Sequence, residues 1–149
     1  MATIKIGCVT NSFDSETKEK NHQKYTHISV KNVQKTFLKF VGQQKQTPPI
    51  FSAIKINGER LYKRARRGEK NIQPKKRQII IENLNILNIN LPFIKFEIKC
   101  SKGTYIRSLA NDIGKQFKCC AYLYNLTRTK IGDYELKKSI YINDINRVF

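Results

Sequence analysis

The chain has 149 residues, of which 40% are hydrophobic, and its formal net charge is +18 at pH 7. This is enough apolar material for one domain with its own core, so a globally disordered protein is excluded. The charge indicates an anionic partner, most often nucleic acid, although 21 of the 29 basic residues are lysine, a bias that a genome rich in A and T would also produce.

The first third of the chain predicts one strand and one helix, separated by a long polar segment. Residues 3–9 are expected to form the strand, and residues 11–27 a surface loop. Ser29 is expected to cap a helix whose apolar positions keep helical spacing, and Gly42 to end it. Residues 43–49 then predict a loop.

The middle of the chain predicts a tight turn, a helix and a pair of strands. Residues 52–56 are expected to form a strand that turns at Asn57-Gly58, a dipeptide that favours positive φ angles. Residues 59–67 have the pattern of a helix. Residues 78–89 and 93–100 alternate or run apolar, which is typical of neighbouring antiparallel strands.

The last third predicts an amphipathic helix over residues 104–117, a strand over 122–131 and a short terminal helix over 143–148. The sequence contains no internal repeat, low-complexity linker or second domain. The expected fold class is α+β, with flanking helices packed on an antiparallel sheet.

The four cysteines are expected to be free, buried thiols in a reducing cytoplasm, and no metal site is predicted. None of them forms a CxxC pair, and His22 and His27 lie in a polar stretch far from three of them. They are Cys8, Cys100, Cys119 and Cys120. There is no signal peptide and no apolar run long enough to cross a bilayer, so a membrane partner is not expected.

The basic segment from Gln46 to Gly68, QTPPIFSAIKINGERLYKRARRG, is one candidate functional motif. Its predicted helix carries Lys63 and four arginines, whose spacing can align several guanidinium groups for phosphates. Tyr62 lies among them and is suited to stack on a base or ribose. The alternative is a solvated basic helix with Tyr62 in the core, and the pattern leaves both open.

The second motif is CSKGTYIRSL, Cys100 to Leu109. Thr104 is expected to cap the helix, which places Arg107 in the first turn, at the unfavourable end of the helix dipole. This position indicates a carboxylate or phosphate partner, or simply a surface arginine beside an acidic residue. The nearest acids, Asp112 and Asp133, form no catalytic spacing, so by pattern alone the chain looks more like an RNA-binding domain than an enzyme.

Four segments of the chain resemble motifs of the TruB family, the tRNA pseudouridine-55 synthases, and they follow one another in the same order as in that family. The segment from Gln46 to Glu69 is similar to the family pattern Q-x-PP-x-[YF]-SA-x-K-x-x-G-x-x-x-Y-x-x-AR-x-G. CSKGTYIRSLANDIG and NLTRTKIGDY, the latter at residues 125–134, are similar to later motifs. IGCVTNSFDSET, residues 6–17, is similar to a strand end and its T-x-x-x-D loop. The resemblance covers essentially the whole chain.

The resemblance implies an isomerase that cleaves the uracil glycosidic bond, rotates the base and rejoins it through carbon, with no cofactor. Its implied substrate is a uridine flipped out of the T arm of a tRNA in the cytoplasm. Arg107 matches the family arginine that faces the catalytic aspartate, Tyr105 the tyrosine beside it and Leu126 a pocket leucine. The candidate RNA-binding residues are Lys55, Arg60, Tyr62, Arg64, Arg66 and Lys102.

One family motif is missing from the sequence. The nucleophilic aspartate of the family lies in G-x-L-D-P-x-A-x-G, a string that the 149 residues do not contain. Asp14 belongs to the T-x-x-x-D loop and is not expected to replace it. Arg107 is therefore expected to face a cleft lined by Tyr105 and Leu126 without a carboxylate of this chain in bidentate contact.

Residues 1–149 are accordingly expected to form a single partial domain, the second half of a synthase catalytic domain, without the RNA-binding PUA domain of many members. Three functions stay open. In the first, the chain is part of a synthase, inactive alone, whose N-terminal half is supplied by another polypeptide or was lost in gene calling. In the second, it is a non-catalytic tRNA-binding remnant or chaperone. In the third, it is a ribosome-associated basic protein.

Overall fold

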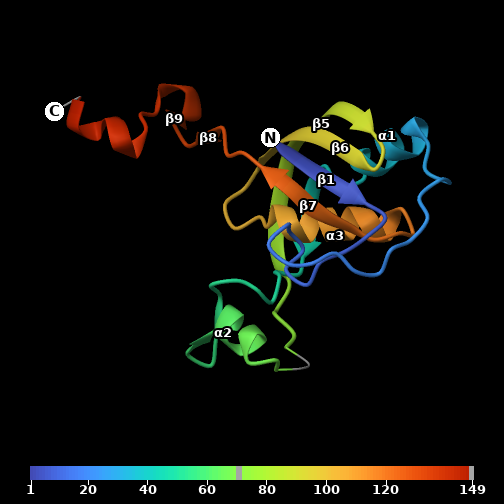
Figure 1. Ribbon diagram of the computed structural model, residues 1–149, viewed down its shortest axis with the longest axis horizontal. Helices are drawn as coiled ribbons and strands as arrows, with labels where there is room; N and C mark the ends of the chain where they lie inside the picture. The colour runs from blue at the N-terminus through green and yellow to red at the C-terminus, as the bar shows by residue number, and fades with distance from the viewer. Residues whose placement is uncertain (70–71, 148–149) are drawn as a thin grey trace.

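The structure, a computed structural model, describes residues 1–69 and 72–147. Its largest feature is a five-stranded sheet in the order β2-β5-β6-β1-β7, in which every neighbouring pair is antiparallel (Figure 1). The strands are β1 (Ala2–Ile6), β2 (Gly42–Gln46), β5 (Arg77–Asn90), β6 (Phe93–Cys100) and β7 (Ala121–Leu126). The expected α+β class is confirmed.

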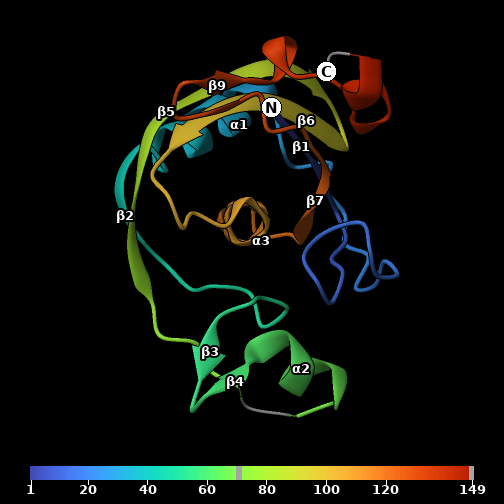
Figure 2. The same ribbon diagram turned by 90° about the vertical axis from the view of Figure 1, so that its left-hand side faces the viewer.

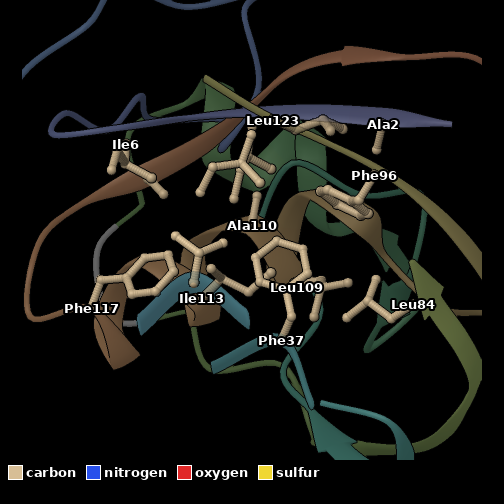
Figure 3. Close-up of a cluster of buried hydrophobic side chains, with 14 of the residues drawn as sticks. Ala2, Ile6, Phe37, Leu84, Phe96, Leu109, Ala110, Ile113, Phe117 and Leu123 are labelled. Atoms are coloured by element: carbon tan, nitrogen blue, oxygen red, sulfur yellow. The ribbon is translucent and has the colours of Figure 1, made fainter. Parts of the chain in front are cut away.

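Two helices, α1 (Val30–Leu38) and α3 (Ile106–Gln116), supply the apolar side chains that the sheet packs against (Figure 3). Strand β1 alternates buried and partly exposed residues, as expected for a strand with one face on the core. Phe37 of α1 meets Phe96 of β6 edge to face, with ring centroids 5.3 Å apart. Gly114 of α3 lies so close to β7 that an added Cβ would stand 2.5 Å from the Ala121 nitrogen.

The predicted N-cap is right for α1 and wrong for α3. The predicted end of the first helix at Gly42 is also wrong, because α1 ends at Leu38 and Gly42 begins β2. The Ser29 hydroxyl accepts a hydrogen bond from the Asn32 amide, 3.2 Å away. Thr104 instead donates its hydroxyl to the Ser101 carbonyl at 2.8 Å, and Tyr105 occupies the N-cap position without a side-chain cap. The Thr104 hydroxyl is used in the turn before the helix, so α3 begins two residues later than predicted.

The predicted loop over residues 43–49 is wrong in its first half. Gln43 to Gln46 belong to β2, an edge strand that pairs with β5. Its sequence, GQQKQ, lacks the β-branched and aromatic residues that mark a strand, because most of its side chains are not in the core.

A small lobe projects from the sheet between β2 and β5 (Figures 1 and 2). We call residues 47–69 the basic lobe. It contains the strands β3 (Lys55–Ile56) and β4 (Glu59–Arg60) and the helix α2 (Leu61–Arg66). The turn predicted at Asn57-Gly58 is confirmed, with φ angles of 53° and 80°. The predicted helix is shorter because Glu59 and Arg60 pair in the hairpin.

The strand predicted over residues 122–131 stops at Leu126, where the Thr127 amide donates to the Met1 carbonyl. The chain then forms a two-stranded hairpin, β8 (Lys130–Ile131) with β9 (Tyr134–Glu135). Two 3-10 helices follow, η1 (Leu136–Lys138) and η2 (Ile142–Arg147), and this segment extends away from the sheet (Figure 1). The predicted terminal helix is thus η2 in the described residues, and Val148 lies outside them. No helix in residues 1–69 and 72–147 has the length and apolarity that a membrane span requires.

Candidate active site and RNA-binding surface

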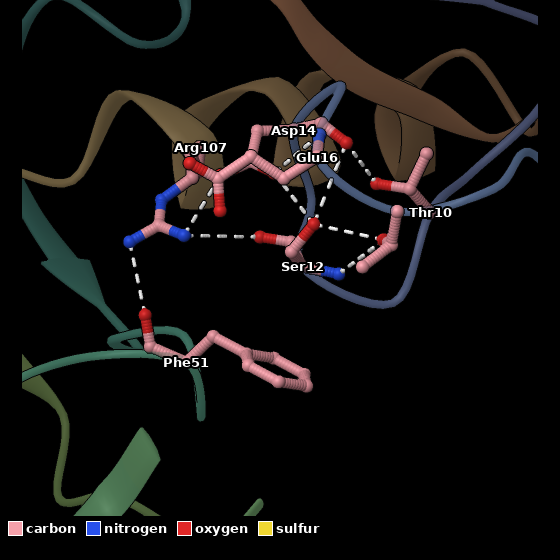
Figure 4. Close-up of polar contacts among 7 residues, drawn as sticks. Thr10, Ser12, Asp14, Glu16, Phe51 and Arg107 are labelled. Carbon is pink, nitrogen blue, oxygen red and sulfur yellow. Dashed lines mark hydrogen bonds and ion pairs between the residues drawn. The ribbon is translucent and has the colours of Figure 1, made fainter. Parts of the chain in front are cut away.

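The loop after β1 holds the carboxylate of Asp14 in a fixed orientation (Figure 4). The Ser12 hydroxyl donates to Asp14 Oδ1 at 2.5 Å, and the Glu16 amide donates to the same oxygen at 3.1 Å. The Thr10 hydroxyl donates to the Asp14 carbonyl at 2.6 Å. The loop is also attached to the sheet, since the Leu123 amide of β7 donates to the Phe13 carbonyl at 2.9 Å.

Arg107 reaches across from the first turn of α3 to this carboxylate. Its Nη1 donates to Asp14 Oδ2 at 2.9 Å and, more weakly, to the Ser12 carbonyl at 3.4 Å. Its Nη2 donates to the Phe51 carbonyl of the basic lobe at 3.0 Å (Figure 4). The side chains of Arg107 and Asp14 are only 24% and 15% exposed, so this ion pair is shielded from water more than a surface pair is. We call this set of contacts the Arg107 junction.

Within the described residues, Arg107 has no bidentate contact with a carboxylate, as expected, but it does have a carboxylate partner. The partner is Asp14 of the T-x-x-x-D loop, a residue for which the sequence pattern predicts no contact with Arg107. The contact is through one guanidinium nitrogen, and the second nitrogen is used by the Phe51 carbonyl, so the pair is not bidentate. The two residues are 93 positions apart in sequence, and only the folded sheet brings the loop and the helix together.

Tyr105 and Leu126 are placed differently from Arg107. The backbone amide and carbonyl of Tyr105 are both bonded to the buried Gln46 side chain, at 2.8 and 3.1 Å. Leu126 stands at the end of β7 opposite Ala2 and is 45% exposed. Within the described residues, the hydrogen bonds of Arg107 reach neither of them. Their role in a uridine pocket stays a prediction.

Two residues that the sequence analysis missed connect α3 to the start of the basic lobe. Gln46 holds Tyr105 as described, and the Ser108 hydroxyl donates to the Thr47 carbonyl at 2.8 Å. Both side chains are buried and polar, and their partners are backbone groups of a distant segment. The sequence gives one indication of the role of Gln46, which is that it is the first residue of the QTPP motif.

Part of the charge in the basic lobe is used to hold the lobe together. Arg67 donates to Glu59 Oε2 at 2.8 Å and to Glu69 Oε1 at 2.6 Å. Arg64 Nε contacts Glu69 Oε2 at 2.7 Å. Hydrogen bonds from Arg67 are the main cause that lowers the pKa of both glutamates. Arg64, a predicted RNA-binding residue, is therefore already paired within the lobe.

The other predicted RNA-binding residues of the lobe lie together. Lys55, Arg60 and Tyr62 line a shallow pocket with Lys63. Arg66 lies over the Tyr62 ring, 5.5 Å from its centroid, which is a cation–π contact. In residues 1–69 and 72–147, the ion pairs include none of Lys55, Arg60, Lys63 and Arg66. Lys102 is exposed in the turn before α3, outside the lobe.

The family described as "TruB family pseudouridylate synthase (N terminal domain)" matches residues 1–106, most of the chain. The chain belongs to the TruB family. A relative named tRNA pseudouridine synthase B from Clostridium novyi is 42% identical over 144 residues, which is 97% of this chain and 49% of the relative. A protein of the same name from Phocaeicola vulgatus is 42% identical over 137 residues, 92% of this chain and 58% of that one. The chain thus spans about half the length of the curated TruB relatives it matches.

A solved structure described as a Cbf5-Nop10-Gar1 complex also has this fold. Its matching chain superposes with a TM-score of 0.67 at 20% identity, and the match covers 97% of this chain and 33% of that one. The family predicted from the sequence motifs is confirmed, and the architecture of the TruB chain agrees with this neighbour.

The Arg107 junction makes a prediction about stability. We expect Asp14→Asn to lower the free energy of unfolding by about 1–2 kcal/mol, because the partly buried guanidinium loses its charged partner. Asp112→Asn is the matched control, since Asp112 forms a more exposed pair with Lys115 and its loss should cost at most about 0.5 kcal/mol. Urea unfolding followed by circular dichroism measures both. Equal urea midpoints for the two variants would contradict the prediction, because the Asp14–Arg107 pair would then stabilise the fold no more than an exposed surface pair does.

Proposed function

We propose that this TruB chain is the part of a tRNA pseudouridine synthase that grips the T arm and presents Arg107 to the reacting uridine. The observation that supports this most is the Arg107 junction. It places the arginine of the GTYIR motif against the T-x-x-x-D loop and the carbonyl of Phe51, in the PPIFSA segment of the basic lobe. Three motifs typical of the family therefore converge on one guanidinium.

The proposed reaction breaks the C1′–N1 bond of uridine, rotates the uracil and forms a C1′–C5 bond. C5 gives up a proton and N1 gains one, so the reaction is an isomerisation that needs no cofactor. The TruB resemblance assigns the nucleophile to the aspartate of a G-x-L-D-P motif, which lies outside these 149 residues. We propose that another segment, in the same polypeptide or a separate one, supplies it.

Within that assembly, Arg107 has an electrostatic role. Asp14 and the Phe51 carbonyl fix the plane of its guanidinium before any substrate binds, so no energy is spent on orienting it during the reaction. A second carboxylate entering beside Asp14 would be held in its ionised form by this cation. Arg107 would thus keep the incoming aspartate charged and oriented toward C1′.

The basic lobe would hold the RNA. Lys55, Arg60 and Lys63 stand around one pocket and have no acidic partner in the ion pairs of the described residues. Glu59 also lines this pocket, but it is paired with Arg67, so the three cations are available to phosphates. Tyr62 presents a ring for stacking on a base. The T arm as the bound element, and the cytoplasm as the place, follow from the TruB resemblance.

A second candidate function is a tRNA-binding chaperone without catalysis. The basic lobe supports it, because RNA binding needs only that lobe, whereas isomerisation also needs the nucleophilic aspartate of the family. Both functions require RNA binding, but only the synthase converts uridine to pseudouridine.

The RNA-binding half of the proposal predicts salt-dependent affinity for a T-arm stem-loop. We expect the double variant Arg60→Ala, Lys63→Ala to bind at least tenfold more weakly, and the slope of log affinity against log salt to fall by roughly 1.5 because two phosphate contacts are lost. Filter binding at several salt concentrations measures both quantities.

The control variant is Lys31→Ala, Lys35→Ala, which removes the same charge from exposed positions on α1, away from the basic lobe (Figure 1). It should keep most of the parent's affinity. If both double variants bind equally, net charge rather than the lobe governs binding, and this part of the proposal is wrong.

The catalytic half predicts complementation. The 149-residue chain alone should release no tritium from a T-arm stem-loop labelled at uridine C5, and adding a polypeptide that carries the G-x-L-D-P motif of the family should restore release. Arg107→Lys should reduce the restored rate about a hundredfold or more, because a lysine cannot reproduce the planar fork. Arg77→Lys, an exposed arginine at the start of β5, should leave it unchanged.

Release by the chain alone would refute the assignment of the nucleophile to another segment. If RNA binds but no combination releases tritium, the chaperone is the better account.

A further inference from the structure

Both ends of the loop that carries Asp14 converge on one group of potential metal ligands. The Val9 and Lys20 backbones exchange two hydrogen bonds, at 3.0 and 2.8 Å, and the Gln23 amide donates to the Gly7 carbonyl at 2.8 Å. These bonds close the loop at its base. Cys8 directly precedes Val9, Glu19 directly precedes Lys20 and His22 follows it, so the three residues lie together at the closure.

We propose that Cys8, Glu19 and His22 form a zinc site that clamps the base of the Asp14 loop. One ligand atom from each lies within 4.8 Å of the other two. In a tetrahedral zinc site with ordinary bond lengths, neighbouring ligand atoms are about 3.5 Å apart. The three side chains therefore need to close by little more than 1 Å. A thiolate, an imidazole and a carboxylate are the ligand types that zinc takes in proteins, and water would complete the set.

The three ligands differ in their surroundings, and a water ligand would leave the fourth zinc position open. Cys8 is 1% exposed, and burial raises the pKa of its thiol to about 11, so zinc would have to displace the proton. Lys5 Nζ and the Tyr122 hydroxyl both donate to Glu19 Oε1, at 2.7 and 2.5 Å, and so orient the carboxylate. Lys5 also forms an ion pair with Glu19, so zinc would bind beside an ammonium group. His22 is exposed on the loop and is the ligand that would move to close the site.

This site was not predicted from the sequence, because neither Cys8–Glu19 nor Glu19–His22 has the spacing of a known zinc motif. Its ligands converge through the backbone bonds that join Val9 to Lys20 and Gly7 to Gln23. It does not depend on the proposed function, since neither RNA nor uridine enters the argument. Zinc here would fix the loop on which Ser12 and Asp14 stand, and would thereby stiffen one side of the Arg107 junction.

Titration of the full 149-residue chain with Co²⁺ as a spectroscopic stand-in, followed by competition with Zn²⁺, tests the proposal. We expect one equivalent of Co²⁺ to give tetrahedral d–d bands and a thiolate-to-metal band that Zn²⁺ abolishes. Cys8→Ala should remove the thiolate band. His22→Gln changes an exposed position and should weaken Zn²⁺ binding at least tenfold. Loss of a residue that only hydrogen-bonds to a metal ligand already costs about tenfold or more in affinity, so loss of a ligand should cost no less.

The matched controls are the remaining histidine and a distant cysteine. His27→Gln and Cys100→Ala should keep the parent's spectrum and affinity. The proposal is overturned if one equivalent of Co²⁺ gives no thiolate band. It is also overturned if Cys8→Ala and His22→Gln bind like the parent, or if a control variant abolishes the site.

Discussion

One guanidinium group connects the three parts of this molecule that matter for its function. Arg107 belongs to α3, which packs on the sheet, and it bonds to Asp14 in the loop after β1 and to Phe51 at the start of the basic lobe. A cation that is only 24% exposed is costly unless it is paired and hydrogen-bonded, so the loop and the lobe are held where they satisfy it. Gln46 and Ser108 reinforce the same arrangement from the strand before the lobe and from α3.

Some cations of the basic lobe form ion pairs within the lobe, and others are left for a ligand. Arg64 and Arg67 neutralise Glu59 and Glu69, and these pairs span the ends of α2. Lys55, Arg60 and Lys63 are left around the pocket beside Tyr62. The net charge of +18 therefore overstates the charge that is available to a ligand at any one place, and the arrangement of the acids decides which cations are left for the proposed RNA partner.

Sequence patterns predicted the elements that depend on local signals. Strands β5 and β6, the Ser29 cap and the Asn57-Gly58 turn each follow from a periodicity or a dipeptide, and the long motifs indicated the TruB family. Contacts between distant residues could not be predicted in this way. Strand β2 has the composition of a loop and is defined by its partner β5. Asp14 reaches Arg107 from a loop whose Phe13 backbone is bonded to β7. No spacing in the sequence encodes these neighbours.

The central claim, that this TruB chain serves T-arm pseudouridine formation through Arg107, is tested most directly by mapping pseudouridine in the tRNA of cells that carry the gene. Chemical derivatisation and primer extension on the T arm give the modified fraction at each uridine. The account predicts that deletion of the gene removes one T-arm pseudouridine, that the wild-type gene restores it, and that a gene encoding Arg107→Lys does not. An unchanged T arm after deletion, or full restoration by Arg107→Lys, would contradict it.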